Sequence, residues 1–255
     1  MRPLNKGNTP LDAAGVAIAP TDYKNWRKAL IGRIGYYCVY CNQPLSHSLQ
    51  VEHVVPKNPP AGYTAGDPLA WSNMLLACGP CNNAKSNKPV DANTYYLPEE
   101  HNTHLPFSIV PSANAEHAIV TAKAPPAVLA AQQQKAQDTI DLLELDNIDE
   151  RPNIVDIRSL KRKAAILSVQ SARIIYDMAV LSPTYNAITV ANDIARRAAD
   201  CGFFSLWYDA FANEPLVMEK LTDNIIIKGT ATTCFDAANG YQPINRNPAN
   251  AADPF

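Results

Sequence analysis

The chain has 255 residues, 47% of them hydrophobic and 18% charged, with six cysteines and a formal net charge of −2. This composition excludes a largely disordered chain and a disulfide scaffold, and no apolar run approaches the roughly 18 residues that span a bilayer or forms a signal-peptide core behind a basic leader. We therefore expect one large domain or two small ones, and neither a membrane protein nor a secreted one.

The first half of the chain predicts a mixture of short helices and strands. After an irregular arm, residues 23–34 have helical spacing, with a cap at Asp22 and a stop at Gly35. The alternating, β-branched residues 49–55 predict a strand, and residues 57–68 a loop rich in Pro and Gly. Further expected elements are an extended segment over 71–77, a short helix from Asn82, and strands over 107–110 and 118–122.

The second half is predicted to be mainly helical. A helix can begin at Pro125-Pro126, because proline is tolerated in a first turn, and runs to about Leu145. Residues 154–181 have the spacing of one long helix. Its apolar residues near one face are Ile157, Leu160, Ala164, Leu167, Ile174 and Met178. Shorter helices are expected around 187–200, 203–212 and 215–226. The segment from residue 237 is rich in Asn, Pro and Ala, which predicts a flexible tail.

Four of the cysteines form two pairs at metal-binding spacing. Two residues separate Cys38 from Cys41, and two separate Cys78 from Cys81. Such a gap lets one tight turn aim both sulfurs at one ion, and two turns complete a tetrahedral zinc site. Two disulfides or a redox dithiol are the alternatives, but nothing indicates an oxidising compartment and a redox pair needs no second pair. The pattern favours structural zinc.

Polar residues suited to phosphodiester chemistry are interleaved with these pairs. Glu52 and His53 end the predicted strand, Asn73 precedes the second pair, and Asn82 follows it. A histidine, with an ordinary pKa of about 6.5, suits general-base work at neutral pH. Glu52 and Asn82 supply oxygen ligands of the kind that Mg²⁺ or Mn²⁺ prefers. Alone, each residue has an ordinary explanation as a surface pair or a helix cap; together and in this order they are specific.

These motifs resemble those of the HNH, or ββα-metal, nuclease family over Tyr37–Lys88. Two departures are Glu52, where Asp is commoner, and Asn82, where many members have His. The resemblance implies a zinc-stapled ββα-metal core within an α+β, mainly helical fold. We divide the chain into an N-terminal arm and helix (1–35), the nuclease core (36–90), a helical accessory and partner-binding region (91–236) and the flexible tail (237–255).

The resemblance also implies roles for the site residues. The chain is expected to be a metal-dependent endonuclease, acting on DNA, with His53 as general base. Glu52 and Asn82 would hold the catalytic Mg²⁺ or Mn²⁺, with Asn83 as an alternative ligand, and Asn73 would hold the loop that orients His53. Candidate phosphate contacts, each with a solvated lysine as the alternative, are Lys57, Lys85 and Lys88.

Outside the core, the chain is similar to the PtuB-like HNH proteins of Septu and retron phage-defence systems. The similarity rests on residues 1–7, on 139–146, and on Arg158, Arg162 and Lys163 beyond them. It implies a cytoplasmic bacterial antiviral nuclease gated by a protein partner, such as an ATPase or a retron complex. The other function considered is a non-catalytic, zinc-stapled subunit that binds nucleic acid or assembles a complex.

The charge distribution agrees with a need for a partner. Residues 1–90 hold 9 Lys and Arg against 4 Asp and Glu, whereas residues 91–255 hold 13 against 20. The basic excess is too small for tight non-specific DNA binding, and the acidic remainder repels DNA. The basic segment 158–163 could contact nucleic acid or an acidic partner, but we favour a solvated helix face. The aromatic residues of 203–211 are expected to form core, with a partner interface as the alternative.

Overall fold

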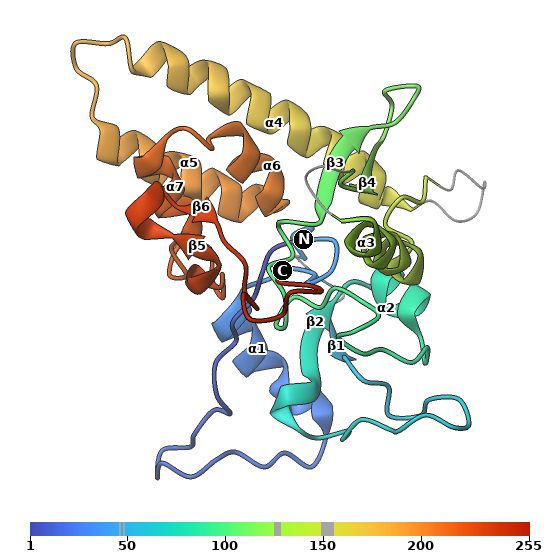
Figure 1. Cartoon of the computed structure of the whole chain (residues 1–255). Coiled ribbons are helices and arrows are strands. Elements are labelled where there is room, and N and C mark those ends of the chain that lie inside the picture. Colours follow the sequence, from blue (N-terminus) through green and yellow to red (C-terminus); the bar gives the residue numbers. More distant parts are fainter. Residues whose placement is uncertain (46, 48, 125–128, 149–155) are drawn as a thin grey trace.

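Seven α-helices and three two-stranded antiparallel sheets make up the part of the chain that the structure describes (Figure 1). This structure is a computed structural model, and it describes residues 1–45, 47, 49–124, 129–148 and 156–255. The predicted fold class, α+β and mainly helical, is confirmed. Among the described residues, no helix combines the length and the apolar character needed to cross a membrane.

The first helix forms where the spacing predicts it. A 3-10 turn, η1 (Tyr23–Trp26), leads into α1 (Arg27–Ile34). The Asp22 carboxylate accepts a hydrogen bond from the Lys24 N–H at the start, and Gly35 ends α1 with a φ of 76° that disfavours other residues. The inward side chains of Trp26, Leu30 and Ile34 are buried.

A ββα unit follows. Strand β1 (Gln50–His53) pairs antiparallel with β2 (Met74–Ala77), which follows the 3-10 turn η2 (Trp71–Asn73), and α2 (Gly79–Lys85) comes next. His53 lies opposite Met74 in the register. Helix α2 begins three residues before the predicted start at Asn82. The reason is that the Cys78 sulfur accepts the Cys81 N–H and acts as its N-cap.

A second hairpin and a helix cover this unit. Strands β3 (Phe107–Pro111) and β4 (Ala118–Ala122) pair antiparallel, close to their predicted bounds. Helix α3 (Ala130–Leu143) then packs against both α2 and β4. The predicted helix start at Pro125-Pro126 lies outside the described residues. Helix α3 ends at Glu144, whose backbone is left-handed.

The remaining helices form a second hydrophobic core. They are α4 (Ile157–Ala179), α5 (Ala187–Cys201), α6 (Phe204–Ala210) and α7 (Pro215–Thr222). The predicted start of the long helix at Ile154 lies outside the described residues. The aromatic residues expected to form core do so, since all are buried: Phe203, Phe204, Trp207, Tyr208 and Phe211.

The two faces of α4 are not arranged as in an ordinary amphipathic helix. Its buried face carries Arg158, Ser159, Arg162, Ala165, Val169, Ala172 and Tyr176. Its apolar face, which includes Leu167, Ile174 and Met178, is exposed. In Figure 1 the helix runs along the upper edge of the molecule. The predicted apolar face therefore exists, but it is turned outward.

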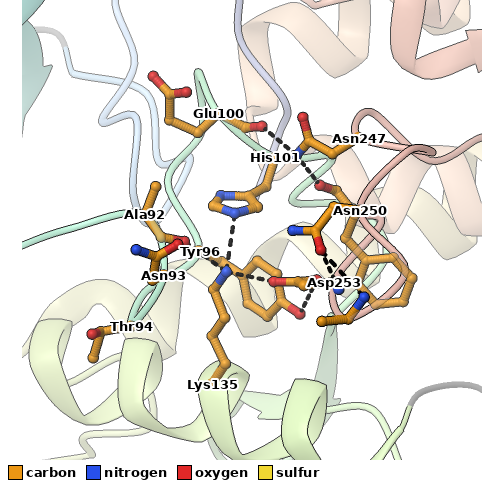
Figure 2. Close-up of polar contacts among 12 residues, drawn as sticks. Ala92, Asn93, Thr94, Tyr96, Glu100, His101, Lys135, Asn247, Asn250 and Asp253 are labelled. Carbon is orange, nitrogen blue, oxygen red and sulfur yellow. Dashed lines mark hydrogen bonds and ion pairs between the residues drawn. The ribbon is translucent and has the colours of Figure 1, made fainter.

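The structure differs from the predicted flexible tail. After η3 (Thr232–Cys234), the chain forms β5 (Phe235–Asp236), η4 (Ala237–Asn239) and β6 (Gln242–Pro243). Near the end, the Asp253 carboxylate lies 2.5 Å from Lys135 Nζ and accepts the Tyr96 hydroxyl at 3.0 Å (Figure 2). Phe255 is buried in the other hydrophobic core, to which α1, β2 and α3 contribute. These few anchoring residues hold the tail, although its composition is that of a loop.

Candidate functional site

Both Cys-x-x-Cys turns meet in one buried cluster. The sulfurs of Cys38, Cys41, Cys78 and Cys81 lie within 4.8 Å of one another, and all four residues are buried. The Cys41 and Cys78 sulfurs are 3.8 Å apart. Zinc–sulfur bonds of about 2.3 Å in a tetrahedron require sulfur separations of about 3.8 Å. The cluster therefore fits a structural zinc ion, as the spacing predicts.

Helix α4 brings two arginines to this cluster. Arg158 Nη1 lies 3.1 Å from the Cys81 sulfur, and its guanidinium also donates to the Leu143 and Glu144 carbonyls at 2.8 Å. Asp156 pairs with the same guanidinium at 2.5 Å. Burial opposes the charged form of Arg158, but the bond to Asp156 and the neighbouring Cys81 outweigh burial and raise its pKa.

Arg162, one helical turn further, is also fully buried. It donates to the Ala118 carbonyl at 3.3 Å, while its Nε and Nη2 have no hydrogen-bond partner among the described atoms. Burial lowers the pKa of Arg162, and the neighbouring Cys41 and Cys81 oppose this change. Four thiolates around one Zn²⁺ would carry a net charge of about −2, which the two guanidinium groups would offset. The expectation of a solvated face is wrong for Arg158 and Arg162. Their four-residue spacing, which places both on one helix face, was the available signal.

His53 lies at the end of β1 with one ring nitrogen engaged. Its Nε2 is 3.2 Å from the Pro68 carbonyl oxygen. Because a carbonyl only accepts hydrogen bonds, Nε2 carries the proton and the lone pair is on Nδ1. Burial lowers the pKa of His53, and Lys57 and Lys85 lower it further. The ring is therefore neutral at pH 7, with Nδ1 available as a base.

Asn73 holds the loop that supplies this carbonyl. Its Oδ1 accepts the Val55 N–H at 2.7 Å, and its Nδ2 donates to the carbonyls of Val55 and Asp67, both at 3.0 Å. Both ends of the loop after β1 are thus tied to one side chain. Gly66 passes so close that a Cβ there would lie 2.5 Å from Asn73 Nδ2. These contacts are the ones expected of a residue that orients His53 through its loop.

Glu52 points to the interior, where it meets a lysine. Its side chain is 3% exposed, with Oε1 2.8 Å from Lys85 Nζ and 3.3 Å from the Tyr40 hydroxyl. Burial raises the pKa of Glu52, and Lys85 opposes that rise. Lys85 also donates to the His53 carbonyl at 2.8 Å and is 1% exposed. The predicted phosphate contact by Lys85 is therefore not supported, because its ammonium is buried in an ion pair.

Asn82, on α2, is linked to β1 through the side chain of Gln50. Its Nδ2 donates to the Gln50 side chain at 2.6 Å, and it is half-buried, whereas Asn83 is exposed. A divalent cation needs open oxygen ligands, but the Glu52 carboxylate already holds the ammonium of Lys85. In this arrangement, the pair of Glu52 and Asn82 does not fit a catalytic divalent cation.

Basic and aromatic side chains surround His53 on the solvent side. The Tyr23 ring from η1 lies 4.6 Å from the His53 ring. The ammonium groups of Lys57 and Lys24 lie 5.1 and 5.8 Å from the centre of the Tyr23 ring. Lys57 and Lys88 are exposed, as phosphate contacts must be. Tyr23 and Lys24 were not predicted, since nothing in the sequence relates η1 to the distant His53.

Comparison with known families agrees with this geometry. Residues 38–88 match the family model described as HNH endonuclease. This segment is about a fifth of the chain and holds the four thiols, His53, Asn73 and the whole ββα unit. No curated protein and no solved structure matches the chain.

Proposed function

From the HNH endonuclease domain at residues 38–88, we propose that the protein is an endonuclease that hydrolyses phosphodiester bonds of DNA, with His53 as the general base. The observation that carries the proposal is the bond between His53 Nε2 and the Pro68 carbonyl. It fixes the tautomer of a neutral ring and leaves the Nδ1 lone pair for a water molecule. A general base needs both properties.

The chain's own residues supply a simple reaction sequence. His53 Nδ1 takes a proton from water, whose oxygen attacks phosphorus, and the bond to the 3′-oxygen breaks. The leaving 3′-oxygen takes a proton from solvent water, and His53 then returns its own proton to the solvent. The products are a 5′-phosphate and a 3′-hydroxyl. Asn73 keeps the Pro68 carbonyl in place through its loop. We assign contacts with the phosphates on either side to Lys57 and Lys88, and this assignment is supported by the exposure of both side chains.

The use of Mg²⁺ or Mn²⁺ remains part of the proposal under one condition. The Glu52 carboxylate becomes a ligand only when the ammonium of Lys85, now 2.8 Å away, leaves it. The same ion pair favours the second candidate function, a non-catalytic zinc-stapled subunit that binds nucleic acid or assembles a complex. A module that does not cut DNA needs no catalytic Mg²⁺ or Mn²⁺, so the Lys85 ammonium can occupy the Glu52 carboxylate without loss of function.

The biological setting is also a proposal. We infer an antiviral effector in the bacterial cytoplasm, whose region 91–236 binds a gating partner such as an ATPase or a retron complex. Two features support this setting: the resemblance of the regions around the core to PtuB-like proteins, and the uneven charge of the chain. Because residues 91–255 carry more acidic than basic residues, DNA binding would gain from a basic partner.

Nicking of supercoiled plasmid tests the proposal. The zinc-loaded wild type is compared with His53→Ala and, as a matched control, with His47→Ala, which removes an exposed histidine outside the site. Each is assayed with Mg²⁺, with Mn²⁺ and with EDTA. We expect His53→Ala to lose about 10²- to 10⁴-fold in rate and His47→Ala to match the wild type.

Two outcomes would contradict the proposal that the protein is a nuclease with His53 as its general base. Equal cutting by the wild type and His53→Ala would show that His53 is not the general base. A wild type that binds DNA but does not cut it under any of the three conditions favours the non-catalytic subunit. Cutting in the presence of EDTA would be consistent with His53 as the general base and would exclude a divalent cation from the reaction.

A further inference from the structure

The outer face of α4 carries an apolar row that nothing in the described part of the chain covers. Met178 and Ile174 are 69% and 61% exposed, and Leu181, two residues past the end of α4 at Ala179, is 85% exposed. The row continues toward the start of the helix through Leu167, Leu160 and Ile157, all exposed. Soluble proteins seldom leave so long an apolar row open to water, and such a patch marks an interaction site.

The spacing of this row is that of a coiled coil. Its positions alternate by three and four residues over the full length of the helix. They are Ile157, Leu160, Ala164, Leu167, Ser171, Ile174, Met178 and Leu181. The α-helix has 23 residues, which is about 35 Å at 1.5 Å per residue. We call this row the α4 seam.

The inner face of α4 prevents the helix from turning the seam inward. Arg158 is bonded to the Cys81 sulfur and to the backbone of residues 143–144. Further along, the Tyr176 hydroxyl donates to Glu214 at 2.7 Å, and Val169 and Ala172 lie in the second core. Rotation of the helix would break all of these contacts. The seam is therefore a fixed feature of the surface.

We propose that the α4 seam binds the α4 seam of a second copy of this chain, with the two helices antiparallel. In that orientation, each small residue of the seam faces a large one. The pairs are Ile157 with Leu181, Leu160 with Met178, Ala164 with Ile174, and Leu167 with Ser171. A parallel, in-register pair would instead place Ala164 on Ala164 and Ser171 on Ser171, which leaves voids at these two layers.

Charges beside the seam favour the same orientation. The flank before the middle of the helix carries Lys161 and Lys163, and the flank after it carries Asp177. An antiparallel pair centred near Val169 brings Lys163 of each copy beside Asp177 of the other. Asp177 is 53% exposed and also pairs with Arg173 on its own helix at 2.8 Å. The result is a two-fold symmetric dimer with two nuclease domains.

Sedimentation of the zinc-loaded full chain tests the seam. We expect a dimer at roughly 100 μM chain, which is above a micromolar Kd. Ile174→Glu should raise the Kd at least about 100-fold, because the seam would have to bury an unpaired carboxylate. Ile225→Glu is the matched control, since Ile225 is 79% exposed and lies outside α4, and it should remain dimeric. A monomeric wild type, or equal behaviour of the two variants, would overturn the proposal.

A charge exchange tests the orientation. Lys163→Glu alone places two carboxylates together at each end of the antiparallel pair and should weaken the dimer about 5- to 10-fold. The double variant Lys163→Glu with Asp177→Lys should regain the wild-type Kd. A parallel pair does not bring these positions together, so failure of the double variant to regain affinity would exclude the antiparallel arrangement.

Discussion

The core of the chain that matches the HNH family model and helix α4 differ in how their polar and apolar residues are placed. In the core, residues 38–88, the buried polar groups are tied to one another: the thiols in a cluster, Glu52 to Lys85, and Asn73 to its loop. In α4, the buried face includes Arg158 and Arg162, while the leucines and isoleucines face water. The spacing of apolar residues therefore predicts which residues share a helix face, but it does not predict whether that face is buried.

The difference follows from what each segment has to cover. The core surrounds a cluster that carries negative charge once the thiols bind a cation. Helix α4 passes over that cluster, and its Arg158 guanidinium, 3.1 Å from the Cys81 sulfur, offsets part of this negative charge. Substitutions in the two regions test this difference.

Loss of the thiol cluster should have the largest effect. Cys78→Ser removes one of four ligands, and metal binding at such a site contributes on the order of 10 kcal/mol to folding. We expect zinc content to fall well below one ion per chain, with a lower Tm. The control is Cys201→Ser, whose sulfur lies outside the cluster. A Cys78→Ser protein with full zinc and unchanged Tm would contradict the site.

Arg158→Met should cost about 3–5 kcal/mol of unfolding free energy. It removes the cation beside Cys81 and leaves the buried Asp156 carboxylate and two carbonyls without their partner. Urea unfolding at equal zinc content measures the loss. Lys161→Met is the control, since it makes the same kind of change on the exposed side of α4. Equal losses in the two variants would show that Arg158 does not support the cluster.

Acid should weaken the anchor of the tail, because His101 Nε2 lies 3.0 Å from the Lys135 ammonium that holds Asp253. Burial, followed by the charge of Lys135, lowers the pKa of His101 to about 4. Unfolding restores a pKa of about 6.5, so the unfolded chain binds the proton more readily between these values. Stability should fall by roughly 3 kcal/mol as the pH drops from 6.5 to 4. His101→Gln should flatten the slope of unfolding free energy against pH in this window; an unchanged slope would contradict the assignment.

Asn73→Ala should cost roughly 1–3 kcal/mol, because it leaves the Val55 N–H without its acceptor. Cutting should fall as well, since the Pro68 carbonyl is no longer held against His53. Gly66→Ala reaches the same loop by steric means, with a Cβ 2.3 Å from the Val55 carbonyl oxygen. Gly32→Ala, in open space within α1, is the control and should stabilise by up to about 1 kcal/mol. Unfolding and nicking assays on the three variants would separate these effects.

The smallest effect is expected on the outer face of α4. At dilutions where the chain is monomeric, Ile174→Glu should change the unfolding free energy by no more than about 0.5 kcal/mol. Val169→Glu, on the inner face of the same helix, should cost several kcal/mol because it buries a carboxylate in the second core. If the two variants lose equal stability as monomers, the faces of α4 are not as described.

Elements whose signals are local could be predicted from the amino-acid sequence. The cysteine spacing, the alternation of β1, the Gly35 stop and the three-four spacing of α4 each act over a few residues, and the structure places the corresponding turns, strand and helices close to their expected bounds. The family match over residues 38–88 rests on the same local pattern.

Contacts between side chains that are far apart in the sequence could not be predicted, because they depend on how the elements pack together. The ion pair between Glu52 and Lys85, the arginines at the thiol cluster, Tyr23 beside His53, and the tail held at Lys135 all join distant parts of the chain. The outward face of α4 was decided in the same way. Helical spacing alone does not fix which face of a helix is buried. In α4, the contacts that the face with Arg158 and Arg162 makes with the rest of the fold turn the apolar face outward.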